Sequence, residues 1–579
     1  MHAWIVVVVV FSLKTSYHDS FILHYKMSRP FIYLLALAGS TATAFLLGRQ
    51  NNIGSVGEIR NLKMRCHASK FENFDYESHW YPVSWACDLE PNEPTKVTVF
   101  DIDYVVAKTM SEGKENVICL EDKCMHKAAA LSQGRVSSNG KNFQCAYHGW
   151  SFDGKSGECV EIPQLVGPDG VSAKIPSRSC AKAFPAQIHQ GMVWIFPGGL
   201  EKALISPPPP TVNELEIEDD FKLCPYVRDF PVDWPILVSN IFDPDHGLFA
   251  HQAVAFDMYS ASKDRPIDME QAYPNDGKGW ILNSKVVARK KLLEVDSKLR
   301  GKDDLKKKVK KNEKQMELWA SSNFHAPIHL QLKRVDKTTG STNFISTFYI
   351  CPVGVGRSRF MAATISKFAT PRWLQKLFTD NFVDQDTYLL ATQQQKILLK
   401  EAKEIQTMMV DDPSFETLRV KSMKTRREMF CLTSPTEKVG ARLEQFWDRT
   451  LLRVPNRIER ILEMNAAGTF LTVPPREYVL DRKAQNLDIC KDSRDSLANV
   501  QKLNKISKTV AIVLLAVKLF GKTPKTIASP TWFASTLGIC YLTAYLTNKM
   551  ERQFFFKYTE DYRKRDLRTI PKKVWIDKE

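Results

Sequence analysis

Cys124-Met125-His126 is followed, after 18 residues, by Cys145-Ala146-Tyr147-His148-Gly149-Trp150. Each segment supplies one thiol and one imidazole, side chains that bind iron and zinc in proteins. Short runs of β-branched and aromatic residues alternate with turns around both segments, from Lys96 to Pro163. The pattern predicts two metal-binding loops within a β-rich domain.

Two kinds of metal site could use these four side chains. A tetrahedral zinc site usually draws on spacings of two to four residues within each pair, and the single-residue gap between Cys124 and His126 is unusual for it. In a Rieske [2Fe–2S] centre, two Cys bind one iron and two His bind the other, so each loop gives one ligand to each iron. The spacing therefore favours a Rieske cluster, which relays single electrons, with four ligands: Cys124, His126, Cys145 and His148.

A second metal centre is predicted around His246 and His251. Five residues correspond to about 140° around a helix axis, so the two imidazoles converge only if the helix bends or unwinds. Alone, such a pair can also be structural. Two His and one carboxylate form the facial triad that holds Fe(II) and leaves positions open for O₂. Asp386 lies on the apolar stripe of a predicted helix over 381–400, where an unpaired carboxylate would be costly, and is the expected third ligand; Asp384 is the alternative.

Two polar residues precede this His pair. The carboxylate of Asp243 is predicted to accept a hydrogen bond from His246 and another from a cluster imidazole, either His126 or His148. Such a bridge would give electrons a hydrogen-bonded route between the two metal centres. Asn240 is expected to lie near the same face.

The composition of the 579 residues excludes several protein classes. Hydrophobic residues make up 44% and charged residues 25%, which is ordinary for globular domains and excludes collagen-like or wholly disordered chains. Twelve Cys are too sparse for a disulfide scaffold. The net charge of +16 is spread over local runs. The densest is a basic insertion over 292–315, which we interpret as a solvated surface rather than a nucleic-acid or anionic-lipid patch.

The N-terminal residues 1–74 are predicted to be a targeting presequence. An apolar stretch from Phe31 to Ala38 and the small residues Ala42-Thr43-Ala44 are typical of a secretory signal, and residues 46–70 are basic and poor in acids, as in transit peptides. The combination resembles the bipartite presequence of complex plastids; a simple secreted or ER-anchored protein is the alternative. Either Met1 or Met27 could be the start.

Two apolar stretches near the C-terminus, 509–520 and 527–546, are separated by the turn sequence Gly521-Lys522-Thr523-Pro524. They predict a membrane helical hairpin over 506–548, after a linker over 486–505 and before a tail over 549–579. A buried hairpin of a soluble domain is the alternative, because only the second stretch has the roughly 20 residues that a span needs.

These motifs resemble the Rieske non-haem iron oxygenases, and within them the pheophorbide a oxygenase group. That group includes the 55-kDa translocon-associated Rieske protein and protochlorophyllide-linked relatives. The resemblance rests on the two cluster loops, the Asn240–Asp243–His246–His251 series and these further stretches: Trp80 to Val83, Leu131 to Val136, Ile162 to Gln164 and Asp384 to Asp386.

The resemblance implies an α+β fold: a Rieske domain over 75–200 and a helix-grip (Bet v 1/START-like) catalytic domain over 201–485. It implies a [2Fe–2S] cluster, mononuclear Fe(II), electrons from ferredoxin or a similar donor, a homotrimer, and a plastid membrane, either inner envelope or thylakoid. The implied reaction uses O₂ to hydroxylate or open a chlorophyll-derived tetrapyrrole; no nucleic-acid partner is expected.

Three departures from the group are visible. Met125 and Lys127 replace the usual Pro and Arg, and the C-terminal Cys-x-x-Cys appears as Cys490 with Ser493 in place of the second Cys, which puts thiol-based regulation in doubt. Two alternative functions remain open: a sterol desaturase or hydroxylase of the cholesterol 7-desaturase type, and a non-catalytic plastid redox or import-associated Rieske protein.

Overall fold

The computed structural model describes residues 73–555, except for these positions: 112, 168–172, 218–220, 244, 247–249, 252–268, 273–280, 290–316, 337–341, 367–370, 435 and 521–528. The predicted presequence up to residue 72, the basic insertion over 292–315 and the tail beyond residue 555 lie outside the described residues.

The first domain consists of three small antiparallel sheets. Their strand orders are β1-β10-β9, β2-β3-β4 and β5-β6-β7-β8. The strands are β1 (Tyr81–Trp85), β2 (Thr95–Val99), β3 (Ile102–Ser111), β4 (Lys114–Glu121), β5 (Arg135–Val136), β6 (Asn142–Gln144), β7 (Ser151–Asp153), β8 (Cys159–Glu161), β9 (Ala186–His189) and β10 (Met192–Ile195).

A separate apolar core supports the cluster loops. Val105 and Ala107 of β3 and Ile118 and Leu120 of β4 alternate along their strands, so they share one face and pack together with Cys124 and its neighbours. The predicted β-rich first domain is confirmed.

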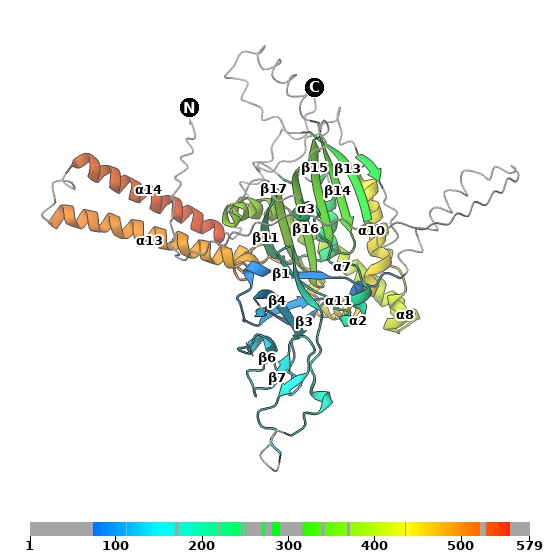
Figure 1. The fold of residues 1–579 in the computed structure, drawn as a ribbon. Helices are drawn as coiled ribbons and strands as arrows, with labels where there is room; N and C mark the ends of the chain where they lie inside the picture. The colour runs from blue at the N-terminus through cyan, green and yellow to red at the C-terminus, as the bar shows by residue number, and fades with distance from the viewer. Residues whose placement is uncertain are drawn as a thin grey trace, which may run out of the picture. The chain divides into compact units, whose positions relative to one another are not determined.

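The second domain is built on a seven-stranded antiparallel sheet with the order β11-β17-β16-β15-β14-β13-β12 (Figure 1). Its strands are β11 (Lys222–Phe230), β12 (Met269–Ala272), β13 (Ile281–Arg289), β14 (Glu317–His325), β15 (His329–Asp336), β16 (Thr342–Gly354) and β17 (Arg357–Ser366). Helices α4 (Trp234–Phe242) and α7 (Arg372–Asp411) pack against this sheet. A long helix packs against an antiparallel sheet, so the predicted α+β class is confirmed.

Helix α7 is long because nothing in its sequence interrupts it. Its 40 residues contain neither Gly nor Pro, and it ends at Asp411, just before the Asp412-Pro413 pair that disfavours further helix. Asp386 therefore lies within an uninterrupted helix, where its backbone is held by hydrogen bonds on both sides.

The remaining helices surround α7 and the sheet or follow them in the chain. They are α2 (Gly199–Ile205), α3 (Glu214–Ile217), α8 (Phe415–Arg419), α9 (Thr425–Met429), α10 (Glu437–Thr450), α11 (Arg457–Ala466), α12 (Arg476–Val479), α13 (Lys491–Phe520) and α14 (Pro530–Phe554). Short helical turns include η2 (Ala86–Asp88) and the π-helical η7 (Lys483–Leu487).

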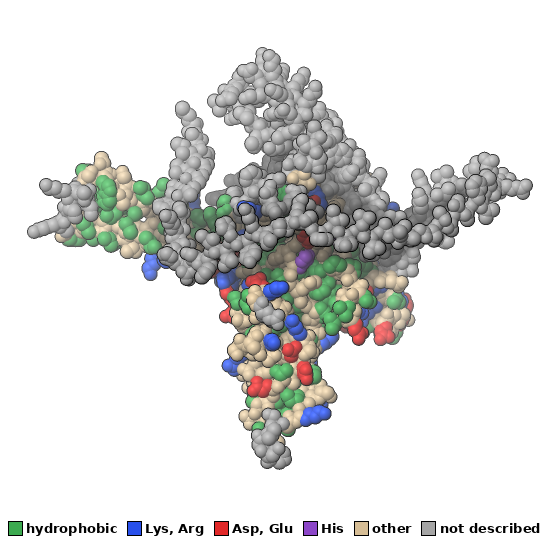
Figure 2. Space-filling model, viewed as in Figure 1, with side chains coloured by type: hydrophobic (Ala, Val, Ile, Leu, Met, Phe, Trp, Pro, Cys, Tyr) green, Lys and Arg blue, Asp and Glu red, His purple; other side chains and the backbone are tan. Residues whose placement is uncertain are grey.

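Helices α13 and α14 lie side by side as a hairpin (Figure 1). Helix α13 begins at Lys491, so much of the stretch predicted as a linker is helical. Apolar side chains are exposed along the hairpin (Figure 2), and those of Leu519, Phe520 and Tyr541 are among the most exposed. Among the described residues, no helix combines the length and the apolar character needed to cross a membrane. The prediction of a membrane-spanning hairpin is therefore not supported.

The two domains are joined by buried and partly buried polar contacts. The Trp85 indole N–H donates to the Tyr226 backbone oxygen at 3.0 Å. Arg359 binds both carboxylate oxygens of Asp229, at 2.7 and 2.9 Å, and donates to the Val83 backbone oxygen at 2.7 Å. One continuous apolar core runs through both domains at this joint.

Candidate metal centres and substrate pocket

The two cluster loops have the same backbone design. In the first, the Cys124 N–H donates to Ala129 O at 2.8 Å and Cys124 O accepts from the Ala128 N–H at 2.9 Å. In the second, the Cys145 N–H donates to Trp150 O at 2.9 Å and Cys145 O accepts from the Gly149 N–H at 3.0 Å. Both loops need a residue with positive φ four positions after the Cys: Ala128 at 58° and Gly149 at 73°. This repeated geometry presents one Cys and one His from each loop.

The thiols and the imidazoles occupy different environments. Cys124 and Cys145 are each 2% exposed, whereas His148 is exposed and His126 is partly so. The two imidazole rings lie 4.5 Å apart, and that of His126 stacks on Trp150 at 4.8 Å. A cluster held here would have its Cys side buried and its His side at the surface, where a redox partner can approach.

The surroundings shift the pKa values of these groups in different directions. Burial, followed by the neighbouring Cys145, raises the pKa of the Cys124 thiol to about 11, so a thiolate there requires a nearby cation such as iron. Desolvation and the neighbouring His126 lower the pKa of His148, which favours the neutral imidazole that ligates metals. Nδ1 of His126 is buried and has no hydrogen-bond partner, as expected of a ligand atom.

The geometry favours a cluster over a single zinc ion. Ligand atoms around one tetrahedral zinc lie within about 4 Å of one another. In the described part of the chain, the group of three or more candidate ligands whose atoms all lie within 4.8 Å of one another is His246, His251 and Asp386, and it includes none of the four cluster residues. No three of the four cluster side chains therefore offer ligand atoms within 4.8 Å of one another, which disfavours a single tetrahedral zinc ion.

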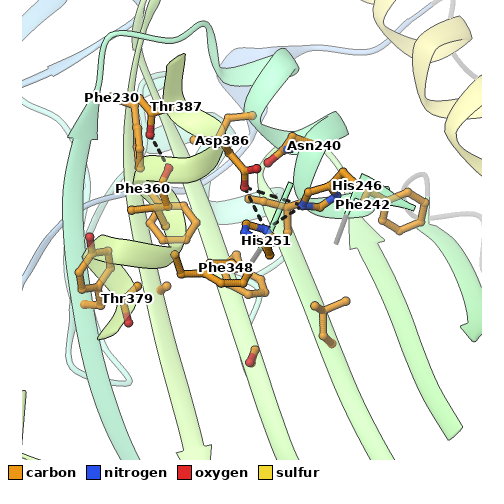
Figure 3. Close-up of a pocket in the computed structure, with 18 of the residues that line it drawn as sticks. Phe230, Asn240, Phe242, His246, His251, Phe348, Phe360, Thr379, Asp386 and Thr387 are labelled. Carbon is orange, nitrogen blue, oxygen red and sulfur yellow. Dashed lines mark hydrogen bonds and ion pairs between the residues drawn. The ribbon is translucent and has the colours of Figure 1, made fainter. Parts of the chain in front are cut away.

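The second centre brings together the three residues predicted for it. Nε2 of His251 lies 3.1 Å from Oδ2 of Asp386, and Nε2 of His246 lies 3.8 Å from the same oxygen. The two Nε2 atoms are 3.2 Å apart. Figure 3 shows the three side chains pointing toward one another, with dashed lines between them. One small cation at their centre would satisfy all three donors, so the residues fit the predicted iron.

The two imidazoles converge because helix α4 stops before them. Helix α4 ends at Phe242, where the Asp243 N–H caps it by donating to Ser239 O and Asn240 O. His246 then begins a separate turn, in which its carbonyl accepts from the Ala250 N–H at 2.8 Å. The predicted interruption of the helix is thus present.

Asp243 departs from the predicted bridge. Nδ1 of His246 meets the backbone oxygen of Asp243, not its carboxylate. Because a carbonyl only accepts, Nδ1 carries the proton and Nε2 is left free for a metal. The Asp243 carboxylate instead accepts from the Asp245 N–H at 2.8 Å, and burial raises its pKa. The neighbouring Asp245 carboxylate accepts a hydrogen bond from the Thr436 hydroxyl.

Asp384, the alternative ligand, faces away from the His pair. Its carboxylate binds Arg482 at 2.6 and 2.9 Å and Arg228 at 2.6 Å. Two residues correspond to about 200° around a helix, so Asp384 and Asp386 lie on opposite sides of α7. The structure therefore selects Asp386 as the candidate ligand.

A deep pocket opens beside the His246–His251–Asp386 group (Figure 3). About 1300 Å³ of space, including open solvent at the mouth, lies between the sheet, α4 and α7. Asn240 lines it, as predicted. Its aromatic lining consists of Tyr226, Phe230, Phe242, Phe348, Phe360 and Phe382. In the described residues no Lys or Arg lines this wall, so the pocket suits a large, flat and largely apolar molecule.

Two features of the site were missed at the sequence level. The Phe382 ring stacks on the His251 imidazole with centroids 3.5 Å apart, although its place on the apolar stripe of the helix suggested only core packing. Arg228 is fully buried in strand β11, beside Asp384. A charged residue amid the apolar residues of a predicted strand was the available signal for Arg228.

Comparison with known proteins agrees with this geometry. Residues 79–178 match the Rieske [2Fe-2S] domain family, and residues 324–404 match the pheophorbide a oxygenase family. The first match contains all four predicted cluster ligands, and the second contains Asp386.

Curated relatives show the same pairing of domains. The chain is 39% identical over 191 residues to a chloroplastic pheophorbide a oxygenase of Oryza sativa subsp. japonica, covering 32% of this chain and 35% of the relative. It is 30% identical over 354 residues to the chloroplastic protochlorophyllide-dependent translocon component 52 of Arabidopsis thaliana, covering 56% and 61%. It is 26% identical over 491 residues to the Arabidopsis thaliana pheophorbide a oxygenase, covering 84% and 83%. The chain thus spans less than two thirds of the first two relatives and most of the third. The chain therefore carries a Rieske [2Fe-2S] domain and a pheophorbide a oxygenase domain, and it is similar over most of its length to a chloroplastic pheophorbide a oxygenase.

Proposed function

We propose that this protein is a plastid oxygenase that uses O₂ and electrons from a ferredoxin-type donor to hydroxylate or oxygenolytically open a chlorophyll-derived tetrapyrrole. The observation that carries the proposal is the aromatic pocket beside His246, His251 and Asp386, because it offers room for a large flat substrate next to the three residues that would hold Fe(II). The matches to pheophorbide a oxygenases support the substrate class.

Two groups of residues would bind the two metal centres, one for electron transfer and one for O₂ activation. Cys124, His126, Cys145 and His148 would hold the [2Fe–2S] cluster, and His246, His251 and Asp386 would hold Fe(II). When bound, the cluster supplies electrons singly and the Fe(II) activates O₂. A monooxygenation consumes two electrons and two protons, places one oxygen atom in the substrate and releases the other as water.

The protein's own side chains orient the reactants. The Asp243 carbonyl fixes the His246 tautomer, and Phe382 holds the plane of the His251 ring. The aromatic walls exclude water and align the substrate face, while Asn240 offers a hydrogen-bonding group near the metal site. The exposed side of His148 would receive electrons.

We further propose that three subunits assemble as a ring in which the cluster of one chain serves the iron of its neighbour. The Asp243 carboxylate would then lie on the path between centres, as a positioning residue that accepts from a cluster imidazole of the adjacent subunit. The chloroplastic relatives support a plastid location.

An isotope experiment tests the reaction. Reduced protein is incubated without oxygen with a panel of chlorophyll-derived pigments and sterols, ¹⁸O₂ is admitted, and products are analysed by mass spectrometry. Label in a tetrapyrrole supports the proposal. Label in a sterol alone would favour a sterol desaturase or hydroxylase, and no label in any candidate would contradict oxygenase activity and favour a non-catalytic redox role.

A further inference from the structure

A buried group of charged and polar side chains lies on the side of helix α7 away from the metal site, and one member, Tyr226, also lines the pocket. We call this group the rear cluster, and it consists of Tyr226, Arg228, Lys376, Asp380, Asp384 and Arg482. The pocket and the metal centres described above do not account for its charges.

The rear cluster holds α7 by two carboxylates one turn apart. Asp380 accepts from the Tyr226 hydroxyl at 2.7 Å and pairs with Lys376. Asp384 is held by Arg228 and Arg482, and their side chains are 0% and 1% exposed. Separating a buried ion pair leaves an unpaired charge in the interior, which strongly destabilises the protein. A rotation of α7 would separate these pairs, so this face of the helix has little freedom to rotate.

Fixing this face also fixes the opposite one. Asp386 follows Asp384 by two residues of a continuous helix, so any rotation of α7 that moves Asp384 also moves the Asp386 carboxylate relative to His246 and His251. A displacement of about 1 Å at a metal or catalytic site is enough to impair it.

The rear cluster reaches the end of the C-terminal hairpin. Arg482 uses its remaining arm, Nη1, to donate to the backbone oxygen of Gln553 near the end of α14, at 3.1 Å. Lys376 lies 5.3 Å from the centroid of the Phe554 ring, which is fully buried. The last turn of α14 therefore packs directly against the back of the iron-binding helix.

The start of the hairpin contacts the Rieske domain. The Lys491 N–H at the start of α13 donates to Asp88 at 3.1 Å, and the Lys491 ammonium pairs with Glu90 at 2.7 Å. Arg372, the first residue of α7, binds the same Asp88 carboxylate at 3.0 and 3.1 Å. The two ends of the hairpin thus meet the cluster-bearing domain and the iron-bearing helix.

We propose that Arg482 is a positioning residue for the mononuclear iron site, through which the end of the C-terminal hairpin holds Asp386 in ligating geometry. The inference rests on the proposed function, because it assumes that His246, His251 and Asp386 bind Fe(II). The hairpin would then support the metal site through its buried end, whatever its exposed apolar side chains contact.

The test compares Fe(II) affinity in full-length variants. Arg482→Ala is expected to weaken binding of Fe(II) to the mononuclear site at least tenfold, measured by competition with a chromophoric chelator. The visible absorption and EPR signal of the [2Fe–2S] cluster should be unchanged. Arg482→Lys keeps one contact to Asp384, so its Fe(II) affinity should lie between that of the parent protein and that of Arg482→Ala.

Arg359→Ala is the matched control. Arg359 makes the same kind of contacts, two to an aspartate and one to a backbone oxygen, but in the sheet and away from α7. Its loss should lower the melting temperature and leave Fe(II) affinity within about twofold of the parent. Equal weakening in Arg359→Ala and Arg482→Ala would overturn the proposal, because the effect would then be general destabilisation.

Phe554→Ala keeps the proposal falsifiable if Arg482→Ala does not fold. It loosens the end of α14 without removing a charge, and it should weaken Fe(II) binding several-fold. Unchanged affinity in Phe554→Ala, or in a folded Arg482→Ala, contradicts the inference. A parent protein that binds no iron at the mononuclear site would instead contradict the proposed function.

Discussion

At the scale of single residues, Asp384 and Asp386 show how position on a helix decides the role of a carboxylate. They are two positions apart on α7, yet one pairs with two arginines and the other faces two imidazoles. Chemical type alone cannot separate them. What separates them is the rotation of about 200° between their side chains.

Substituting a ligand of one metal centre should leave metal binding at the other centre unchanged. Asp386→Asn replaces an anionic ligand by a neutral amide and should abolish stable Fe(II) binding while the cluster EPR signal stays at full strength. Cys124→Ser should abolish the cluster EPR signal and leave Fe(II) binding at the mononuclear site unchanged. Metal analysis and EPR of both variants check this; loss of both metals in either variant would show that the centres are not independent.

Glu444 provides a pH-dependent contribution to stability. It is largely buried, and although Arg426 lies 3.1 Å away, desolvation and the nearby Asp448 and Glu401 raise the pKa of Glu444 to about 7 from its ordinary 4.5. The folded protein then keeps a proton that the unfolded chain has released. The free energy of unfolding should therefore fall by roughly 1–3 kcal/mol as the pH rises from about 4.5 to 7.

Glu444→Gln removes this titration. Urea unfolding at pH 5 and pH 8 should show a smaller difference in the variant than in the parent protein. An unchanged pH dependence would mean that Glu444 is ionised in the folded state throughout this range.

At the scale of elements, the cluster loops depend on backbone conformations that few residues adopt. Gly149 has φ of 73°, and a Cβ there would lie 3.0 Å from the Pro163 ring. Gly149→Ala should destabilise the domain by about 1–2 kcal/mol and lower cluster occupancy, as judged by melting temperature and visible absorption.

Ala128 is the matched position in the other loop, with φ of 58°. Ala128→Gly relieves the same backbone strain but makes the unfolded chain more flexible, so stability should change by less than about 1 kcal/mol. A large loss in Ala128→Gly together with none in Gly149→Ala would refute the account of the loops.

Local sequence patterns predicted the elements better than the contacts between them. The cluster ligands, the interruption before His246 and the place of Asp386 on α7 all follow from spacing and periodicity, because these act within a few residues. The Asp243 carboxylate was assigned the contact that its backbone oxygen makes, since sequence does not distinguish the two oxygen types. The predicted membrane-spanning hairpin rested on the length of two apolar stretches, but no helix among the described residues is both long and apolar enough to cross a membrane.

The rear cluster could not be predicted, for a different reason. Arg482 contacts residues 98 and 71 positions away in the chain, Asp384 and Gln553. Such contacts are set by how helices pack, and one sequence carries no record of that pairing.

At the scale of the whole molecule, the proposed assembly predicts complementation between subunits. Cys124→Ser chains lack the cluster and Asp386→Asn chains lack the iron, so each homotrimer should be inactive. If electrons cross between neighbours, mixed trimers should recover a measurable fraction of parental oxygenation. The assay is ¹⁸O incorporation after co-expression, with trimer formation checked by light scattering; inactive mixed trimers would mean that electrons stay within one chain.

The account as a whole depends on two different iron centres in one chain. The most direct measurement is iron and sulfide analysis of the purified full-length protein combined with EPR before and after anaerobic Fe(II) addition. We predict two irons with two sulfides in a Rieske-type cluster, plus one further iron that is lost in Asp386→Asn. Zinc in place of the cluster, or no binding of a third iron to the parent protein, would contradict the central claim.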